Sequence, residues 1–233
     1  MKIKRITGKI TNIENLSPTA KEIFIRLSEP TDFIPGSFFN VFMDIDGQKV
    51  RRAFSVSSSS QDQNNISFTI RLSPAGVMTP LFWNKDMVGE TLELMGPLGL
   101  NTVDKMTKNK IFLFAFGVGV GVLKSIADYF TTQTNLKSLT IITGSRVEDE
   151  ILHKDYFDSL MKKSNNITVT NVVSRPLNNS NLPNGYIQDH INGLDFNDSD
   201  VYVCGQESAC NSLIEKIESK QPNNTSYFVE GFH

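Results

Sequence analysis

Short runs of alternating apolar and polar residues occupy the first hundred positions, and turns rich in proline, glycine and asparagine separate them. Such alternation is typical of strands with one buried face. The runs predict strands over residues 6–13, 22–27, 38–45, 53–57, 66–72 and 91–95, with one short helix over 79–83. Short strands at this spacing indicate an antiparallel β-barrel or sandwich.

From residue 108 the pattern changes to unbroken apolar runs that alternate with amphipathic stretches of helical period. We expect strands over 111–116, 139–143, 167–173, 201–204 and 226–229, and helices over 120–131, 156–163, 187–191 and 210–219. Buried strands alternating with helices are typical of a doubly wound parallel sheet. The sequence therefore predicts an antiparallel β-barrel over 1–100, followed by an α/β doubly wound parallel sheet over 106–233.

Composition narrows the possible partners. The net charge is −2 and no basic run is present, which argues against nucleic acid or an anionic membrane surface as a partner. The longest apolar run, 111–123, is shorter than the roughly 20 residues of a membrane span. The start of the chain also lacks the apolar core of a signal peptide. We therefore expect no membrane span.

Cysteine and histidine usage argues against a resident metal. Cys204 and Cys210 are too few to hold an iron–sulfur cluster, and the three histidines show no ligand spacing. The cysteines imply no disulfide framework, so we expect a cytoplasmic protein in a reducing compartment.

Two segments of the first domain carry groups that suit a dinucleotide. Arg52 can make a charge-assisted bond to a diphosphate, while Phe54 packs on a ring and Ser55 bonds its edge from the opposite strand face. The segment 76–79 precedes the short predicted helix, whose free amides, with Gly76 and Thr79, offer an anion site. The alternatives are an edge strand with a solvated arginine and a plain helix cap.

Glycines at 117, 119 and 121 directly follow a predicted buried strand. A common dinucleotide fingerprint would need glycine where Val122 stands. It would also need an acidic residue at the end of the second strand, where Gly144-Ser145-Arg146 lies. The fingerprint is therefore not met. A glycine turn at the carboxyl end of a parallel strand still suits a phosphate, although a purely structural turn fits equally well.

The order of these segments resembles the ferredoxin–NADP reductase superfamily over nearly the whole chain. In that family the first domain binds FAD and the second binds a nicotinamide nucleotide. The segments that match its motifs, in order, are Pro35-Gly-Ser-Phe38, Arg52-Ala-Phe-Ser55, Gly76-Val-Met-Thr79, Gly96-Pro-Leu-Gly99, Gly117 to Val122, Tyr202-Val-Cys-Gly-Gln206 and Tyr227-Phe-Val-Glu-Gly-Phe232.

The chain departs from the family at several positions of these motifs. Val118 stands in place of a threonine and removes one hydroxyl contact to the nucleotide. Val122 and Gln206 stand in place of prolines, which is expected to loosen both turns. The last residue is His233 rather than an aromatic, so Phe232 is our candidate for the ring beside the flavin.

The resemblance implies an FAD-containing oxidoreductase that passes a hydride between NAD(P)H and flavin. Single electrons would then pass to or from a protein carrier such as ferredoxin or flavodoxin. By the same resemblance, Ser55 hydrogen-bonds near the reactive flavin nitrogen, Cys204 borders the nicotinamide, and Glu230 supplies negative charge there. A buried small apolar side chain is the alternative interpretation of Cys204.

Nucleotide choice depends on three residues of the second domain. NADP-using relatives hold the ribose phosphate with a Ser-Arg pair and a tyrosine, which Ser174, Arg175 and Tyr186 resemble, so NADP(H) is slightly favoured over NAD(H). A solvated loop arginine is the alternative. The residues expected to bind cofactors are Arg52, Ala53, Phe54, Ser55, Gly76, Val77, Met78, Thr79, Gly117, Val118, Gly119, Ser174, Arg175, Tyr186, Cys204, Gly205 and Phe232.

Two further functions stay open. One is an electron-transfer subunit of a larger oxygenase or dehydrogenase complex, although such subunits often carry their own cluster, for which the cysteines are missing here. The other is a non-catalytic flavin- or nucleotide-binding module. The presence of Ser55, Cys204 and Glu230 together argues against the module.

Overall fold

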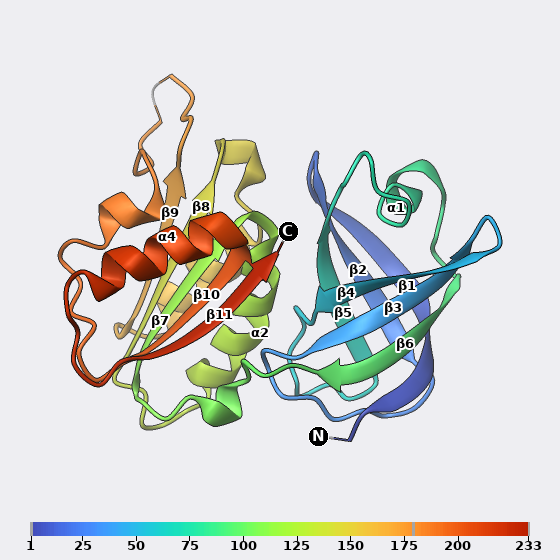
Figure 1. The fold of residues 1–233 in the computed structure, drawn as a ribbon, viewed down its shortest axis with the longest axis horizontal. Helices are drawn as coiled ribbons and strands as arrows, with labels where there is room; N and C mark the ends of the chain where they lie inside the picture. Colours follow the sequence, from blue (N-terminus) through green and yellow to red (C-terminus); the bar gives the residue numbers. More distant parts are fainter. Residues whose placement is uncertain (1, 179, 233) are drawn as a thin grey trace.

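The computed structural model describes residues 2–178 and 180–232 and contains two sheets that lie side by side (Figure 1). His233, which the sequence comparison singled out, falls outside the described residues. The first sheet is built from the amino-terminal part of the chain and the second from the remainder. No helix within the described residues is long and apolar enough to cross a membrane.

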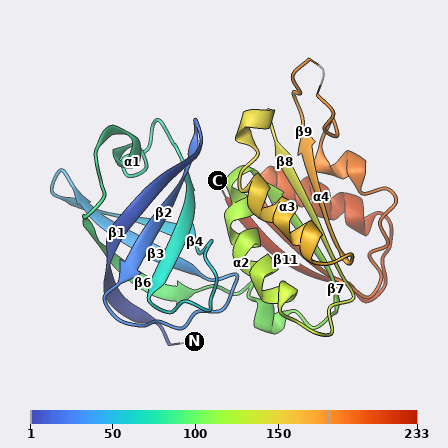
Figure 2. The same ribbon diagram turned by 180° about the vertical axis from the view of Figure 1, so that it is seen from behind.

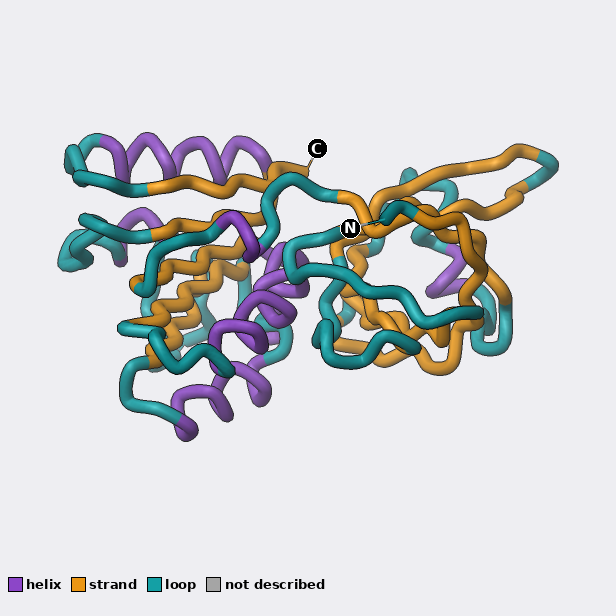
Figure 3. Tube along the Cα trace, turned by 90° about the horizontal axis from the view of Figure 1, so that it is seen from below, coloured by secondary structure: helices purple, strands orange, loops and turns teal. Residues whose placement is uncertain are grey.

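The first sheet is antiparallel and curls toward a closed ring (Figure 3). An isolated bridge between Val56 and Phe68 links its two outer strands, and the Ser57 amide donates to the Ser67 carbonyl at 2.8 Å. Alternate side chains point inward and form one apolar core. In the order β4-β3-β6-β1-β2-β5, its strands are β4 (Gln48–Ser55), β3 (Phe38–Ile45), β6 (Thr91–Leu98), β1 (Lys4–Ser17), β2 (Ala20–Leu27) and β5 (Asn65–Arg71).

The expected strands are confirmed in this sheet, and several of them, β4 among them, extend beyond the predicted bounds. Strand β4 begins at Gln48 rather than at residue 53, because its first residues pair with β3 but remain outside the core. The turn between these strands uses Asp46 and Gly47, both with positive φ. Such turns match the twist of a hairpin. The short helix is α1 (Leu81–Asn84), which begins two residues after the predicted start.

The second sheet is parallel, with helices on both faces. Along β7, Ile111 and Leu113 join the core beneath α2 and α3, while Phe112 and Phe114 join the core beneath α4. Figures 1 and 2 show these two opposite faces. In the order β11-β10-β7-β8-β9, its strands are β11 (Ser226–Phe232), β10 (Asp200–Gln206), β7 (Lys110–Phe116), β8 (Ser138–Ser145) and β9 (Ile167–Val173), and its helices are α2 (Val120–Thr131), α3 (Lys154–Lys163) and α4 (Glu207–Glu218).

Strand β7 is the point at which the strand order reverses, because β8 lies on one side of it and β10 on the other. A reversal of this kind opens a crevice at the carboxyl end of a doubly wound sheet. Helix α2 follows β7 and runs between the two sheets (Figure 3). A Cβ on its Gly121 would lie 2.5 Å from Oγ1 of Thr69 in β5, so this glycine permits the close approach of the domains.

A buried polar cluster joins the domains behind this contact; we call it the interdomain cluster, formed by Glu22, Ser57, Ser67, Thr69, Lys124 and His153. The Glu22 carboxylate accepts hydrogen bonds from Ser67 at 2.6 Å and Ser57 at 2.9 Å. It also lies 3.5 Å from Nδ1 of His153 and 3.7 Å from Nζ of Lys124. Nε2 of His153 and Oγ1 of Thr69 are 2.9 Å apart.

Burial and charge act oppositely inside this cluster. Burial lowers the pKa of His153 to about 4, although the Glu22 carboxylate opposes that shift. Burial alone would raise the pKa of Glu22, but the Lys124 charge, the charge of His153 when that ring is protonated, and the two serine hydrogen bonds bring it below its usual range. At neutral pH the cluster therefore holds an ionised Glu22 and a neutral His153.

Candidate functional site

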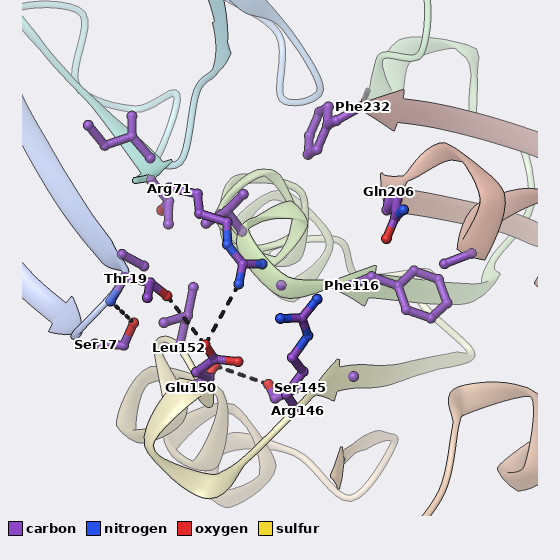
Figure 4. A pocket seen from close by; sticks show the side chains of 18 of the residues that line it. Ser17, Thr19, Arg71, Phe116, Ser145, Arg146, Glu150, Leu152, Gln206 and Phe232 are labelled. Atoms are coloured by element: carbon purple, nitrogen blue, oxygen red, sulfur yellow. Dashed lines mark hydrogen bonds and ion pairs between the residues drawn. The ribbon is translucent and has the colours of Figure 1, made fainter. Parts of the chain in front are cut away.

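A cleft of about 850 Å³ lies between the two domains at the carboxyl end of the parallel sheet (Figure 4). The barrel contributes the ends of β4 and β5, including Phe54, Ser55 and Arg71. The second domain contributes the loops that follow β7, β8, β9 and β10. The cleft therefore sits at the strand-order reversal, where this kind of sheet binds ligands.

Ser55 and Glu230 meet across the domain boundary beside this cleft. The Ser55 hydroxyl donates to Oε2 of Glu230 at 3.2 Å, although 175 positions separate them in the chain. The Cys204 thiol lies 3.8 Å from the same oxygen, and Cys210 donates weakly to the Glu230 carbonyl at 3.9 Å. Parallel pairing of β10 with β11 sets Cys204 directly beside Glu230. The fold thus brings together the three residues predicted to be catalytic.

The surroundings of Glu230 favour its protonated form. Burial raises the pKa of Glu230 to about 7, although hydrogen bonds from its neighbours oppose the shift. The hydroxyl of Tyr202 is buried beside it and interacts with the carboxylate, but it forms no hydrogen bond of ordinary geometry. Burial, together with the Glu230 charge, raises the pKa of the Cys204 thiol well above its usual value. At neutral pH Cys204 is therefore a thiol, while Glu230 can hold or release a proton.

The glycine turn after β7 forms the floor of the crevice. Gly117 has φ of +56° and lines the cleft. A Cβ on Gly119 would lie 2.4 Å from the Cys204 carbonyl oxygen, and one on Gly205 would lie 2.6 Å from Cβ of Phe116. These glycines let the start of α2 and the end of β10 pack against one another. The start of a helix leaves amides without intrahelical partners, which suits an anion.

Most of the residues predicted for the second domain converge on the cleft. Ser174, Arg175 and Tyr186 line it together with Gly117 and Val118, and Tyr186 is 66% exposed. Phe232 also lines it and is 36% exposed (Figure 4). Gly119, Cys204 and Gly205 support this wall from behind rather than lining it.

The barrel residues divide into two groups. Ala53, Phe54 and Ser55 line the cleft, whereas Arg52 is exposed, stays outside it and donates to the Arg51 carbonyl at 2.7 Å. The remaining four, Gly76, Val77, Met78 and Thr79, also lie outside the cleft. Met78 is buried in the barrel core, and the Thr79 hydroxyl accepts from the Ser73 amide at 3.0 Å.

The expectation of free amides at the start of the short helix is wrong. The amides of Leu81, Phe82 and Trp83 donate to the carbonyls of Met78, Thr79 and Pro80. Within segment 76–79, the amides of Val77, Met78 and Thr79, one turn earlier, make no hydrogen bond. An anion site in this segment would therefore use the loop itself, and a loop of free amides suits a diphosphate.

Sequence reasoning missed two residues of the cleft. Arg71 ends β5, and its Nη2 lies 3.7 Å from Oε1 of Glu150 in the turn η3 (Glu148–Glu150). Both residues line the cleft, so the acidic residue that seemed to be missing after β8 is present, but further along the chain. The sequence could have identified Arg71, because residues two positions apart in a strand share a face, and Arg71 therefore lies on the same face as Thr69 in the predicted strand 66–72.

The residues present fit a dinucleotide better than a metal. Within the described part of the chain, no group of three or more histidine, cysteine or acidic side chains is placed to hold a metal ion. The cleft instead combines a serine hydroxyl, three arginines, a glycine turn and aromatic rings. These are groups that bind phosphates and planar rings.

Comparisons with known proteins agree with this chemistry. Residues 7–102 match the oxidoreductase FAD-binding domain family, and residues 113–216 match the oxidoreductase NAD-binding domain family. The chain is 25% identical over 239 residues to the 2-halobenzoate 1,2-dioxygenase electron transfer component of Burkholderia cepacia, covering all of this chain and 69% of that protein. It is 24% identical over 186 residues to ferredoxin–NADP reductase B of Sorangium cellulosum, covering 79% of this chain and 76% of that protein.

The fold is shared with a solved reductase. A ferredoxin NADP⁺ reductase from Neisseria gonorrhoeae, solved with bound FAD and NADP, superposes with a TM-score of 0.83 over the whole of both chains at 17% identity. The chain spans between 59% and 69% of the length of three dioxygenase electron transfer components that it matches. The predicted fold, a barrel-like antiparallel sheet followed by a doubly wound parallel sheet, is confirmed.

Proposed function

Because the chain belongs to the ferredoxin–NADP reductase superfamily of flavin oxidoreductases, we propose that it is an FAD-containing reductase fed by NAD(P)H. It takes a hydride from the nicotinamide and passes single electrons to a protein carrier such as ferredoxin or flavodoxin. The observation that carries the proposal is the contact of Ser55 with Glu230 across the domain boundary, at the edge of the cleft. Neither domain alone has both residues.

The barrel residues would hold the flavin. Arg52 and the free amides of Val77, Met78 and Thr79 supply charge and donors for its diphosphate. Phe54 offers a ring face at the cleft, and Ser55 offers a hydroxyl there. When bound, FAD supplies the conversion between a two-electron hydride and single electrons.

The second domain would hold and align the nucleotide. Gly117 and Val118 offer backbone to its phosphates, and Cys204 sits behind the site as a neutral thiol. Glu230, whose pKa burial raises to about 7, can hold a proton near the reacting atoms or release it. Phe232 covers the cleft and limits access of water.

We favour NADPH over NADH as the donor. Ser174, Arg175 and Tyr186 line one end of the cleft together, and an arginine binds a phosphate through paired hydrogen bonds. A cytoplasmic location fits the two free, buried cysteines, Cys204 and Cys210, which call for no oxidising compartment.

A second candidate is the electron-transfer subunit of an oxygenase. The Burkholderia relative is an electron transfer component of a dioxygenase, and this chain spans only part of its length. In that case the physiological acceptor is a partner subunit rather than a free carrier.

The test begins with purified protein. We expect a yellow sample whose flavin absorbance bleaches anaerobically with NADPH or NADH, and colourless protein that takes up no added FAD would overturn the proposal. Assays with ferredoxin, flavodoxin and small acceptors then separate the two candidates. Bleaching without turnover on any of them would favour the subunit.

A further inference from the structure

Arg71 reaches from the barrel to the second domain at the cleft. Its Nη2 lies 3.7 Å from Oε1 of Glu150, and a Cβ on Gly117 would lie 3.3 Å from its Nη1 (Figure 4). The guanidinium therefore sits over the glycine turn after β7. A cation over such a turn adds charge-assisted hydrogen bonds to the attraction that the turn itself has for a phosphate.

Glu150 is held in place by both domains. Its carbonyl accepts from the Ser145 hydroxyl at 3.0 Å, which fixes the turn η3 against the end of β8. Its carboxylate accepts from the Thr19 hydroxyl of the barrel at 3.4 Å, in addition to pairing with Arg71. The carboxylate therefore lies beside the Arg71 guanidinium, and both side chains line the cleft.

Exchange of this carboxylate for a ligand anion is physically easy. The Arg71 and Glu150 side chains are 42% and 22% exposed, and ion pairs with this exposure are weak because solvent screens them. A phosphate offers more charge and more acceptor oxygens than a carboxylate. Both anions on one guanidinium would repel each other, so the carboxylate has to give way.

We propose that Glu150 is a resident counter-anion for Arg71, displaced when the diphosphate of the dinucleotide binds, and that it thereby lowers the affinity of the site. The inference rests on the proposed function, because it takes the cleft to bind a nicotinamide dinucleotide. A residue that weakens binding also speeds release of the oxidised nucleotide, which a turning-over reductase requires.

The test measures binding directly, by titration calorimetry of NADP⁺, NAD⁺ and ADP-ribose into the purified protein, because these ligands cannot reduce the flavin. Glu150→Gln keeps the shape and the Thr19 contact but removes the charge. We expect its dissociation constant to fall by about twofold to fivefold for all three ligands, the range that exposed ion pairs give. Asp149→Asn is the matched control, since Asp149 is an exposed carboxylate of the same turn outside the cleft, and it should leave binding unchanged.

A double-mutant cycle identifies the mechanism. In an Arg71→Gln background, Glu150→Gln should no longer tighten binding, because the carboxylate then has no guanidinium to occupy. Glu150→Asp withdraws the carboxylate by one methylene, and its dissociation constant should fall between those of the wild type and Glu150→Gln. High salt should reduce the difference between wild type and Glu150→Gln.

Several results would overturn the inference. Binding that is unchanged or weaker in Glu150→Gln contradicts it, as does equal tightening in the Arg71→Gln background, which would indicate general repulsion. Tightening for NADP⁺ alone would place the effect on the ribose phosphate instead. If the wild type binds none of the three ligands, the proposed function fails, and that outcome differs from failure of the inference, in which wild-type binding is normal.

Discussion

His153 should make the stability of this protein depend on pH in a way that one substitution removes. Its side chain is 5% exposed and sits between Glu22 and Thr69 in the interdomain cluster. Burial lowers its pKa from an ordinary value near 6.5 to about 4 in the folded state. In the unfolded chain the imidazole takes up a proton below pH 6.5, whereas in the folded protein it resists doing so until about pH 4.

The sign and size of the effect follow from this difference. Well above pH 6.5 the ring is neutral in both states and contributes no pH dependence. As pH falls, the unfolded state gains protons first, so the free energy of unfolding decreases. Proton linkage with these two pKa values gives a loss of about 2 kcal/mol between pH 7 and pH 5 from His153 alone. Glu22 adds nothing in this window, because its pKa lies below its usual range.

The assay is urea unfolding of wild type and His153→Asn at pH 7, 6 and 5. Asparagine suits the site because His153 has φ of +54°, a backbone conformation that asparagine adopts readily. At pH 7 we expect the variant to be less stable by about 1 kcal/mol, through loss of the Thr69 hydrogen bond. On acidification it should lose less stability than wild type, so that the two curves approach or cross. His190→Asn, outside the cluster, is the control.

Parallel curves for wild type and His153→Asn would refute the reasoning. They would mean that His153 binds its proton equally in both states, either because water reaches the ring or because Glu22 compensates fully. A control variant that behaves like His153→Asn would also count against it, because the effect would then not belong to the interdomain cluster.

Four further changes have defined outcomes. Arg52→Ala should weaken the binding of FAD by about 1.5–3 kcal/mol in equilibrium dialysis. Unchanged retention would show that the diphosphate does not bind at Arg52. Arg175→Ala should raise the Michaelis constant for NADPH far more than for NADH; equal effects would indicate NADH as the natural donor. Glu230→Gln should flatten the pH dependence of flavin reduction around pH 7, and an unaltered profile would exclude Glu230 as its source. Gly121→Ala, whose Cβ would lie 2.5 Å from Oγ1 of Thr69, should lower the free energy of unfolding in urea by about 1–3 kcal/mol. An unchanged unfolding midpoint would show that the domains move apart at this contact without cost.

Periodicity alone predicts most of the fold. Helix α2 and strands β3 and β9 have the expected bounds, because each carries an unbroken apolar pattern. The first residues of β4 could not be found in this way. Gln48 and Lys49 pair with β3 but are exposed and lie outside the apolar core, so no alternation marks them.

The site could be predicted where its motifs resemble those of a known family and not elsewhere. Ser55 and Glu230 are 175 positions apart, and the role of both residues and of Cys204 in one site is implied by that resemblance rather than by their spacing. Glu150 escaped notice because nothing in the spacing of residues 144–150 shows that its turn reaches back to Arg71. Similarly, Glu22 lies in a strand pattern where an apolar residue would fit, and its burial is explained only by partners distant in the chain, two barrel serines and the Lys124 and His153 side chains of the second domain.

The close approach of Gly121 to Thr69 limits how this protein could be recombined with its relatives. A chimera that takes its barrel from another reductase would bring a different side chain against α2, and any residue larger than threonine there would push the lobes apart. The grafted barrel would also have to supply a carboxylate opposite Lys124 and His153. The seam between the lobes, more than either lobe, therefore determines which exchanges of modules yield a working protein.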